Sequence, residues 1–151
     1  MAGLVLLGVP ATLSDKPRAA ELWDTVRELR DPVDPALATA LVDGMTATPL
    51  GRGFLRTVVD EVLKSPAHVW RETLRGLLET DLRATLTGIL VPTLVVWGDQ
   101  DPILPREDQQ TILDAVPDSR LLVYEGVGHV PYWEDPDRVL RDLAAFMADH
   151  A

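Results

Sequence analysis

Three short runs of consecutive apolar residues divide the chain, and each ends at or near a glycine. The runs cover residues 3–9, 92–97 and 121–124. A strand that is buried on both faces has such a continuous apolar sequence, whereas a strand with one wet face alternates apolar and polar residues. The pattern therefore predicts three strands of a parallel sheet.

Between the first two runs, apolar residues recur at intervals of three and four over residues 14–88, which predicts a long helical region. Pro17 and the pairs Asp34-Pro35 and Ser65-Pro66 predict the starts of its helices, because proline suits the first helical turn and a preceding Asp or Ser can cap it.

After residue 90 the chain predicts strand, helix, strand, helix, with helices over 107–116 and after Asp135-Pro136. This order is typical of parallel strands joined by right-handed crossovers, so the predicted fold class is α/β with a short sheet of about three strands. In the final helix we expect five apolar side chains to face inward: Val139, Leu140, Leu143, Phe146 and Met147.

Composition narrows the possible partners. Lys and Arg number 14 against 24 Asp and Glu, a net charge of −10, which repels nucleic acid and anionic lipid. The chain has no cysteine, which excludes disulfides, thiolate metal sites and a cysteine nucleophile and fits a cytoplasmic protein. No apolar run is long enough to span a membrane. No group of histidines and carboxylates has the spacing of metal ligands. We therefore predict no metal, no cofactor and no membrane contact.

Candidate catalytic residues follow the second and third predicted strands. The first group is Gly98-Asp99-Gln100-Asp101, and the second is Gly126-Val127-Gly128-His129. Side chains at the carboxyl ends of adjacent parallel strands can meet, and ligands bind there. Imidazole exchanges protons near neutral pH, and a carboxylate bonded to it fixes its tautomer. Both Asp101 and Asp99 are candidates for that carboxylate; Asp99 is the better candidate for bonding the turn backbone.

These two motifs resemble those of the α/β-hydrolase family. Val91-Pro92-Thr93 leads into Trp97-Gly98-Asp99-Gln100-Asp101, and Gly128-His129 leads into Glu134-Asp135-Pro136. The resemblance implies that Asp101 is the acid and His129 the general base of a catalytic triad. It further implies a partial α/β-hydrolase domain over 1–151, with core segments 1–13 and 89–151 and a helical cap over 14–88.

The nucleophile of that family stands in a Gly-x-Ser-x-Gly turn, and no such turn occurs here. Ser14 and Ser65 are predicted to be helix caps, and Ser119 a turn residue. We therefore expect a hydrolase of esters or related acyl compounds that lacks the nucleophile and the oxyanion hole and is inactive alone. An aspartate nucleophile would instead mean a haloalkane dehalogenase or epoxide hydrolase. A haloperoxidase-like relative and a non-catalytic binding module are further alternatives.

The predicted partner is a small-molecule substrate, whose apolar part would contact the cap. The candidate contacts are Trp70, Leu74, Leu77 and Leu78. His68 is expected on the helical region, either at the surface or lining the cap, and His150 in the tail. Because the strand at 3–9 would have an apolar edge without a neighbour, we also expect self-association there, and a start at Met1 that truncates a longer domain.

Overall fold

The computed structural model describes residues 3–150, and residues 1, 2 and 151 of the predicted domain lie outside the described part. Its sheet has three parallel strands in the order β1-β2-β3, namely β1 (Leu4–Leu7), β2 (Thr93–Gly98) and β3 (Ser119–Tyr124). Every residue of β2 is buried, as its uninterrupted apolar sequence predicts. The predicted α/β class and the three-stranded sheet are therefore confirmed.

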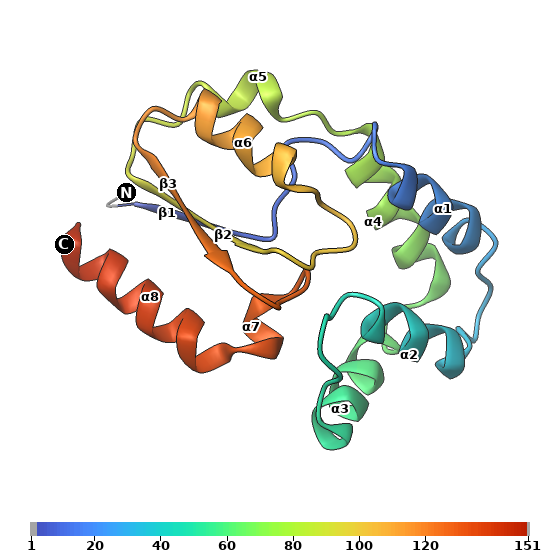
Figure 1. The fold of residues 1–151 in the computed structure, drawn as a ribbon. Helices are drawn as coiled ribbons and strands as arrows, with labels where there is room; N and C mark the ends of the chain where they lie inside the picture. The colour runs from blue at the N-terminus through green and yellow to red at the C-terminus, as the bar shows by residue number, and fades with distance from the viewer. Residues whose placement is uncertain (1–2, 151) are drawn as a thin grey trace.

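Helices cover both faces of the sheet (Figure 1). On one face lie α5 (Arg83–Leu86) and α6 (Arg106–Ala115), which bury side chains of β2 such as Val95 against Ile112. On the other face lies α8 (Pro136–Asp149), where Phe146 packs into a cluster with Leu94 and Tyr124. The short helix α7 (Pro131–Glu134) connects the end of β3 to α8.

Helix α8 begins as predicted, because the Asp135 side chain accepts a hydrogen bond from the amide of Arg138. The expectation that all its apolar residues face inward is wrong. Val139 and Phe146 are buried, but Leu140 and Met147 are 67% and 68% exposed. One helical turn is 3.6 residues, so these two side chains, seven positions apart, lie together on the outer side of the helix.

Four further helices lie beside the sheet: α1 (Pro17–Val26), α2 (Pro35–Asp43), α3 (Arg52–Val62) and α4 (Ala67–Glu79). They pack on one another through their own apolar clusters (Figure 1). We call α1–α4 and their connecting loops the helical insertion. Helix α5 falls within the predicted cap range of 14–88, yet its Leu86 packs on the sheet core.

Two predicted capping serines do not cap helices. The Ser14 hydroxyl pairs with that of Thr12, 3.0 Å away, and α1 starts later, after Lys16. Helix α4 has no capping bond from its preceding residue; its first amide, that of Ala67, donates instead to Asp31, 36 positions earlier. At the start of α4, a distant contact has therefore replaced the local bond that the sequence suggested.

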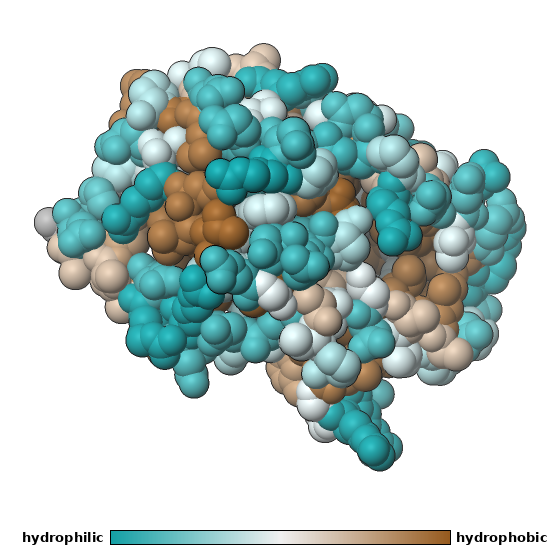
Figure 2. Space-filling model, viewed as in Figure 1, coloured by the Kyte–Doolittle hydropathy of each residue, from teal (hydrophilic) through white to brown (hydrophobic). Residues whose placement is uncertain are grey.

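Strand β1 is at the edge of the sheet and, among residues 3–150, pairs with β2 alone. Figure 2 shows apolar side chains gathered between α6 and α8, over the sheet, and again over the helical insertion. Self-association through the β1 edge stays a prediction, which size-exclusion chromatography can test.

Candidate functional site

The turns that follow β2 and β3 pack so closely that only glycine fits between them. A Cβ atom on Gly98 would lie 2.2 Å from the carbonyl oxygen of Val127 and 2.3 Å from that of Gly128. The amide of Gln100 donates to the same Val127 carbonyl at 3.0 Å. This contact brings the two turns together, and with them the two predicted catalytic side chains.

Asp101 and His129 form a hydrogen-bonded pair, with 2.9 Å between His129 Nδ1 and Asp101 Oδ2. The Asp101 side chain is fully buried, whereas that of His129 is 21% exposed. Oδ1 of Asp101 accepts the amides of Ile103 and Leu104 at 2.8 and 3.0 Å, which fixes the carboxylate. Because an ionised carboxylate can only accept, Nδ1 carries the proton and Nε2 is left to take one from a substrate or nucleophile.

Asp99, the competing carboxylate, bonds the turn instead. Its Oδ1 accepts the amide of Gly126 at 2.7 Å and the side-chain amide of Gln100 at 3.2 Å. Gly126 has a φ of +74°, a conformation that glycine adopts without strain and other residues disfavour, and Asp99 helps hold this turn before His129.

The backbone around His129 also contacts the end of β1 and the helical insertion. Gly8, at a φ of +57°, has no room for a Cβ, which would lie 2.5 Å from the carbonyl of His129. On the other side, the His129 amide donates to the carbonyl of Met45 at 2.8 Å. All three strand ends therefore converge on the histidine, and the loop after α2 is bonded to it.

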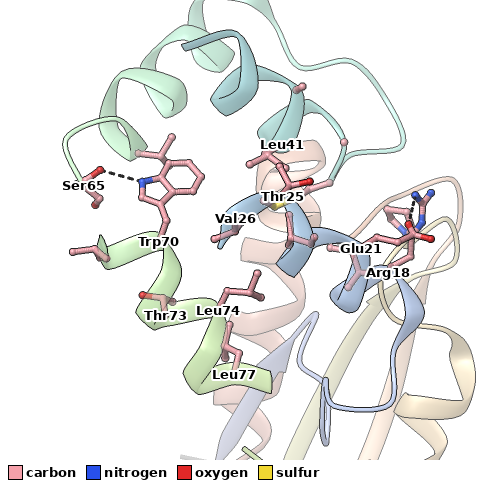
Figure 3. Close-up of a pocket in the computed structure, with 18 residues that line it drawn as sticks. Arg18, Glu21, Thr25, Val26, Leu41, Ser65, Trp70, Thr73, Leu74 and Leu77 are labelled. Atoms are coloured by element: carbon pink, nitrogen blue, oxygen red, sulfur yellow. Dashed lines mark hydrogen bonds and ion pairs between the residues drawn. The ribbon is translucent and has the colours of Figure 1, made fainter. Parts of the chain in front are cut away.

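An apolar cavity of about 620 Å³ opens between α1, α2 and α4 (Figure 3). Pro102 and Ile103, directly after Asp101, line it, as does Met45. Its polar lining is sparse and includes an Arg18–Glu21 ion pair of 3.6 Å at one side (Figure 3). Asp101 and His129 do not line the cavity themselves, but the residues directly after Asp101 and the Met45 loop that is bonded to His129 do.

Three of the predicted substrate contacts line this cavity, namely Trp70, Leu74 and Leu77. Leu78 does not line it; it packs in the cluster of the helical insertion with Val26 and Leu29. His68 is exposed on α4 and is no part of the lining, and His150 Nδ1 lies 2.8 Å from the Phe146 carbonyl oxygen.

No hydroxyl within residues 3–150 hydrogen-bonds to Nε2 of His129. Ser119, which begins β3, donates its hydroxyl to the Val116 carbonyl at 2.7 Å, and Ser14 pairs with Thr12. Ser65 lines the cavity, where its carbonyl accepts the indole N–H of Trp70 at 3.0 Å. In the same part of the chain no group of three or more His, Asp or Glu could hold a metal ion, and no helix is long and apolar enough to cross a bilayer.

Glu134 is a site residue that the sequence did not single out for a role. Its carboxylate accepts hydrogen bonds from the amides of Gly128, Ala47 and Thr48 at 2.7, 2.9 and 2.9 Å. The only sequence signal for it is its position shortly after His129, whereas two of its partners lie more than 80 residues away.

A sequence profile described as the alpha/beta hydrolase family matches residues 1–142. The chain belongs to the α/β-hydrolase family. It is 33% identical to the epoxide hydrolase EphH of Mycobacterium tuberculosis, over 82% of this chain and 57% of that protein. It is also 30% identical to a non-heme haloperoxidase of Rhodococcus erythropolis, over 65% of this chain and 36% of that protein.

Solved structures of other α/β-hydrolases have the same fold. An esterase from Exiguobacterium antarcticum superposes with a TM-score of 0.84 at 19% identity, covering 96% of this chain and 56% of the esterase. The family resemblance drawn from the two motifs is thereby confirmed. The chain covers at most 57% of the length of these three relatives.

Proposed function

We propose that this chain provides the acid–base pair and the substrate pocket of an ester hydrolase. The observation that carries the proposal is the buried Asp101 bonded to Nδ1 of His129, with the residues directly after Asp101 lining an apolar cavity. In the reaction, Nε2 of His129 takes the proton of the nucleophile and later returns it to the leaving alcohol, while Asp101 stabilises the imidazolium.

The cavity favours an apolar acyl or alcohol group as the bound part of the substrate. Leu74 and Trp70 give it an apolar wall, and Thr25 and Thr73 are among its few polar groups. Burying apolar surface there stabilises the complex by about 25 cal/mol per Å², without the cost of leaving a polar group unpaired. A small ester with an apolar chain fits this chemistry.

The nucleophile and the oxyanion donors belong, in this proposal, to residues other than those of this chain, and the chain alone does not hydrolyse esters. A serine nucleophile is our first choice. An aspartate nucleophile is the second, and the identity to an epoxide hydrolase favours it. In that case His129 activates water against the ester intermediate. The pair of Asp101 and His129 serves either chemistry.

The test is hydrolysis of p-nitrophenyl butyrate by the purified chain, beside the variants His129→Ala and His68→Ala. His68 is exposed and outside the cavity, so it provides a matched control. We expect all three proteins to match the buffer rate, because the nucleophile and the oxyanion donors are missing. Turnover by the wild-type chain that His129→Ala alone abolishes would overturn the proposal that the chain lacks a nucleophile.

The reading frame immediately before the Met1 codon tests the chemistry itself. We expect it to encode a turn of the form Gly-x-Ser-x-Gly or, for the second choice, Gly-x-Asp. If neither this reading frame nor an adjacent gene encodes such a turn, the proposal of a hydrolase would be contradicted. A non-catalytic binding module would then be the better interpretation.

A further inference from the structure

We propose that Glu134 is a positioning residue that holds the His129 turn against the helical insertion. Its carboxylate bonds both sides of that junction. Oε1 accepts the amide of Gly128, the residue before the histidine, at 2.7 Å. Oε2 accepts the amides of Ala47 and Thr48, both at 2.9 Å, and the Thr48 hydroxyl at 3.0 Å.

Three of these four donors bond Oε2 of Glu134, and one bonds Oε1. An ionised carboxylate has about four lone-pair sites, and Glu134 receives four donors. Among residues 3–150 no Lys, Arg or His forms an ion pair with Glu134. Its charge is therefore stabilised by fixed backbone N–H groups and one hydroxyl, which hold a precise geometry better than a mobile surface cation does.

The junction has no spare room. A Cβ on Gly128 would lie 2.7 Å from both the Ala47 nitrogen and the Met45 oxygen, and 2.9 Å from Glu134 Oε1. A displacement of the loop over residues 45–48 toward Gly128 must therefore move the backbone of the histidine turn. The amide of His129 itself donates to Met45 at 2.8 Å, so the same loop bonds the catalytic residue directly.

The residue before Glu134 attaches to the same insertion. Trp133 packs on Phe54 of α3, with ring centroids 6.3 Å apart and an angle of 76° between the planes. Met45 also lines the cavity, so the loop that Glu134 bonds forms part of the pocket. Glu134 thus connects the pocket wall to the histidine, and we infer that it keeps the imidazole in register with Asp101.

This inference rests on the proposed role of His129, but its test needs no substrate. The variants are Glu134→Ala, Glu134→Gln and the control Glu125→Ala. Glu125 is exposed in the turn after β3 and, in the described part of the chain, its side chain makes no hydrogen bond or ion pair. The measurements are NMR hydrogen exchange of the Gly128 and Thr48 amides and of the His129 Nδ1 proton.

In Glu134→Ala, we expect both amide protons and the His129 Nδ1 proton to exchange at least tenfold faster than in the wild type. Circular dichroism should show that this variant remains folded. Glu134→Gln keeps one accepting oxygen and should lie between Glu134→Ala and the wild type. Glu125→Ala should match the wild type. Asp101→Asn identifies the Nδ1 signal, because it removes the accepting oxygen.

An Nδ1 proton that exchanges at the wild-type rate in Glu134→Ala overturns the inference, even if the melting temperature falls, because Glu134 then acts on stability alone. If Glu134→Ala does not fold, Glu134→Gln decides by the same criterion. The exchange rates measured in the Glu134 variants do not test the ester-hydrolase proposal. The hydrolysis assay and the preceding reading frame test that proposal separately.

Discussion

Replacing Asp101 separates two roles that its carboxylate combines. Oδ1 accepts the amides of Ile103 and Leu104, which form the turn after β2, and Oδ2 bonds His129 Nδ1. Asp101→Ala removes both sets of bonds. Asp101→Asn keeps an accepting oxygen for the two amides but presents an NH₂ group to the histidine.

The expected losses of stability follow from these bonds. A buried donor left without an acceptor costs about 1–3 kcal/mol, so the two amides predict a loss of about 2–6 kcal/mol for Asp101→Ala. Asp101→Asn should lose only about 1 kcal/mol, because the turn keeps its acceptor. The asparagine NH₂ instead forces His129 Nδ1 to accept, which moves the imidazole proton to Nε2.

Urea unfolding measures the stabilities, and ¹⁵N NMR of the imidazole measures the tautomer. Asp99→Asn is the matched control: its side chain bonds the turn at Gly126, and the tautomer of His129 should not change. In a complete active site, the wrong tautomer should lower kcat by about 10⁴-fold, as it does in the serine protease triad. Equal stability losses for the two Asp101 variants, or an Nδ1–H tautomer in Asp101→Asn, would refute this reasoning.

Three further predictions concern stability. Gly98→Ala should lower the free energy of unfolding by about 3 kcal/mol or more, since its Cβ would meet backbone oxygens at 2.2 and 2.3 Å. The control Gly76→Ala, at an exposed position of α4, should raise the free energy of unfolding by about 0.5–1 kcal/mol. Thermal unfolding measures both changes. Burial lowers the pKa of Lys16, but the hydrogen bonds and negative charges of Asp108 and Asp15 together outweigh this effect and raise the pKa. These interactions therefore stabilise the fold below about pH 10, and their contribution is lost as the pH rises further. Lys16→Met should therefore lower the free energy of unfolding, measured in urea at neutral pH, by about 3–5 kcal/mol. The variant should also lose less stability than the wild type as the pH rises above about 10, and an equal loss in both would contradict this prediction. Leu74→Ala should lower the free energy of unfolding, measured by calorimetry, by about 2–5 kcal/mol, because the Leu74 side chain is only 8% exposed. A loss below about 1 kcal/mol would contradict this prediction and show that the neighbouring side chains fill the space that Leu74 leaves.

The sequence predicted the sheet and the contact between Asp101 and His129 because both depend on local signals. The continuous apolar runs correspond to β1, β2 and β3, and the glycine turns after β2 and β3 place Asp101 beside His129. Adjacent parallel strands end at the same edge of a sheet, so two motifs one strand apart must meet there.

The contacts of Glu134 could not be predicted, because its partners Ala47 and Thr48 lie 87 and 86 positions away on a loop whose packing no spacing encodes. Helix α4 shows the same limit: Ser65 had the right type and position for a cap, yet the distant Asp31 bonds its first amide. Tertiary packing decided both cases.

The most direct test of the central claim is a chimera that joins residues 3–150 to the part of the Exiguobacterium antarcticum esterase that this chain does not cover. The chain superposes on 56% of that esterase, so the remainder would complete the domain. We predict that the folded chimera hydrolyses p-nitrophenyl butyrate, that His129→Ala and Asp101→Asn each reduce the rate by orders of magnitude, and that His68→Ala does not. A folded chimera without activity, or with activity that His129→Ala leaves unchanged, would contradict the claim that Asp101 and His129 form a working acid–base pair.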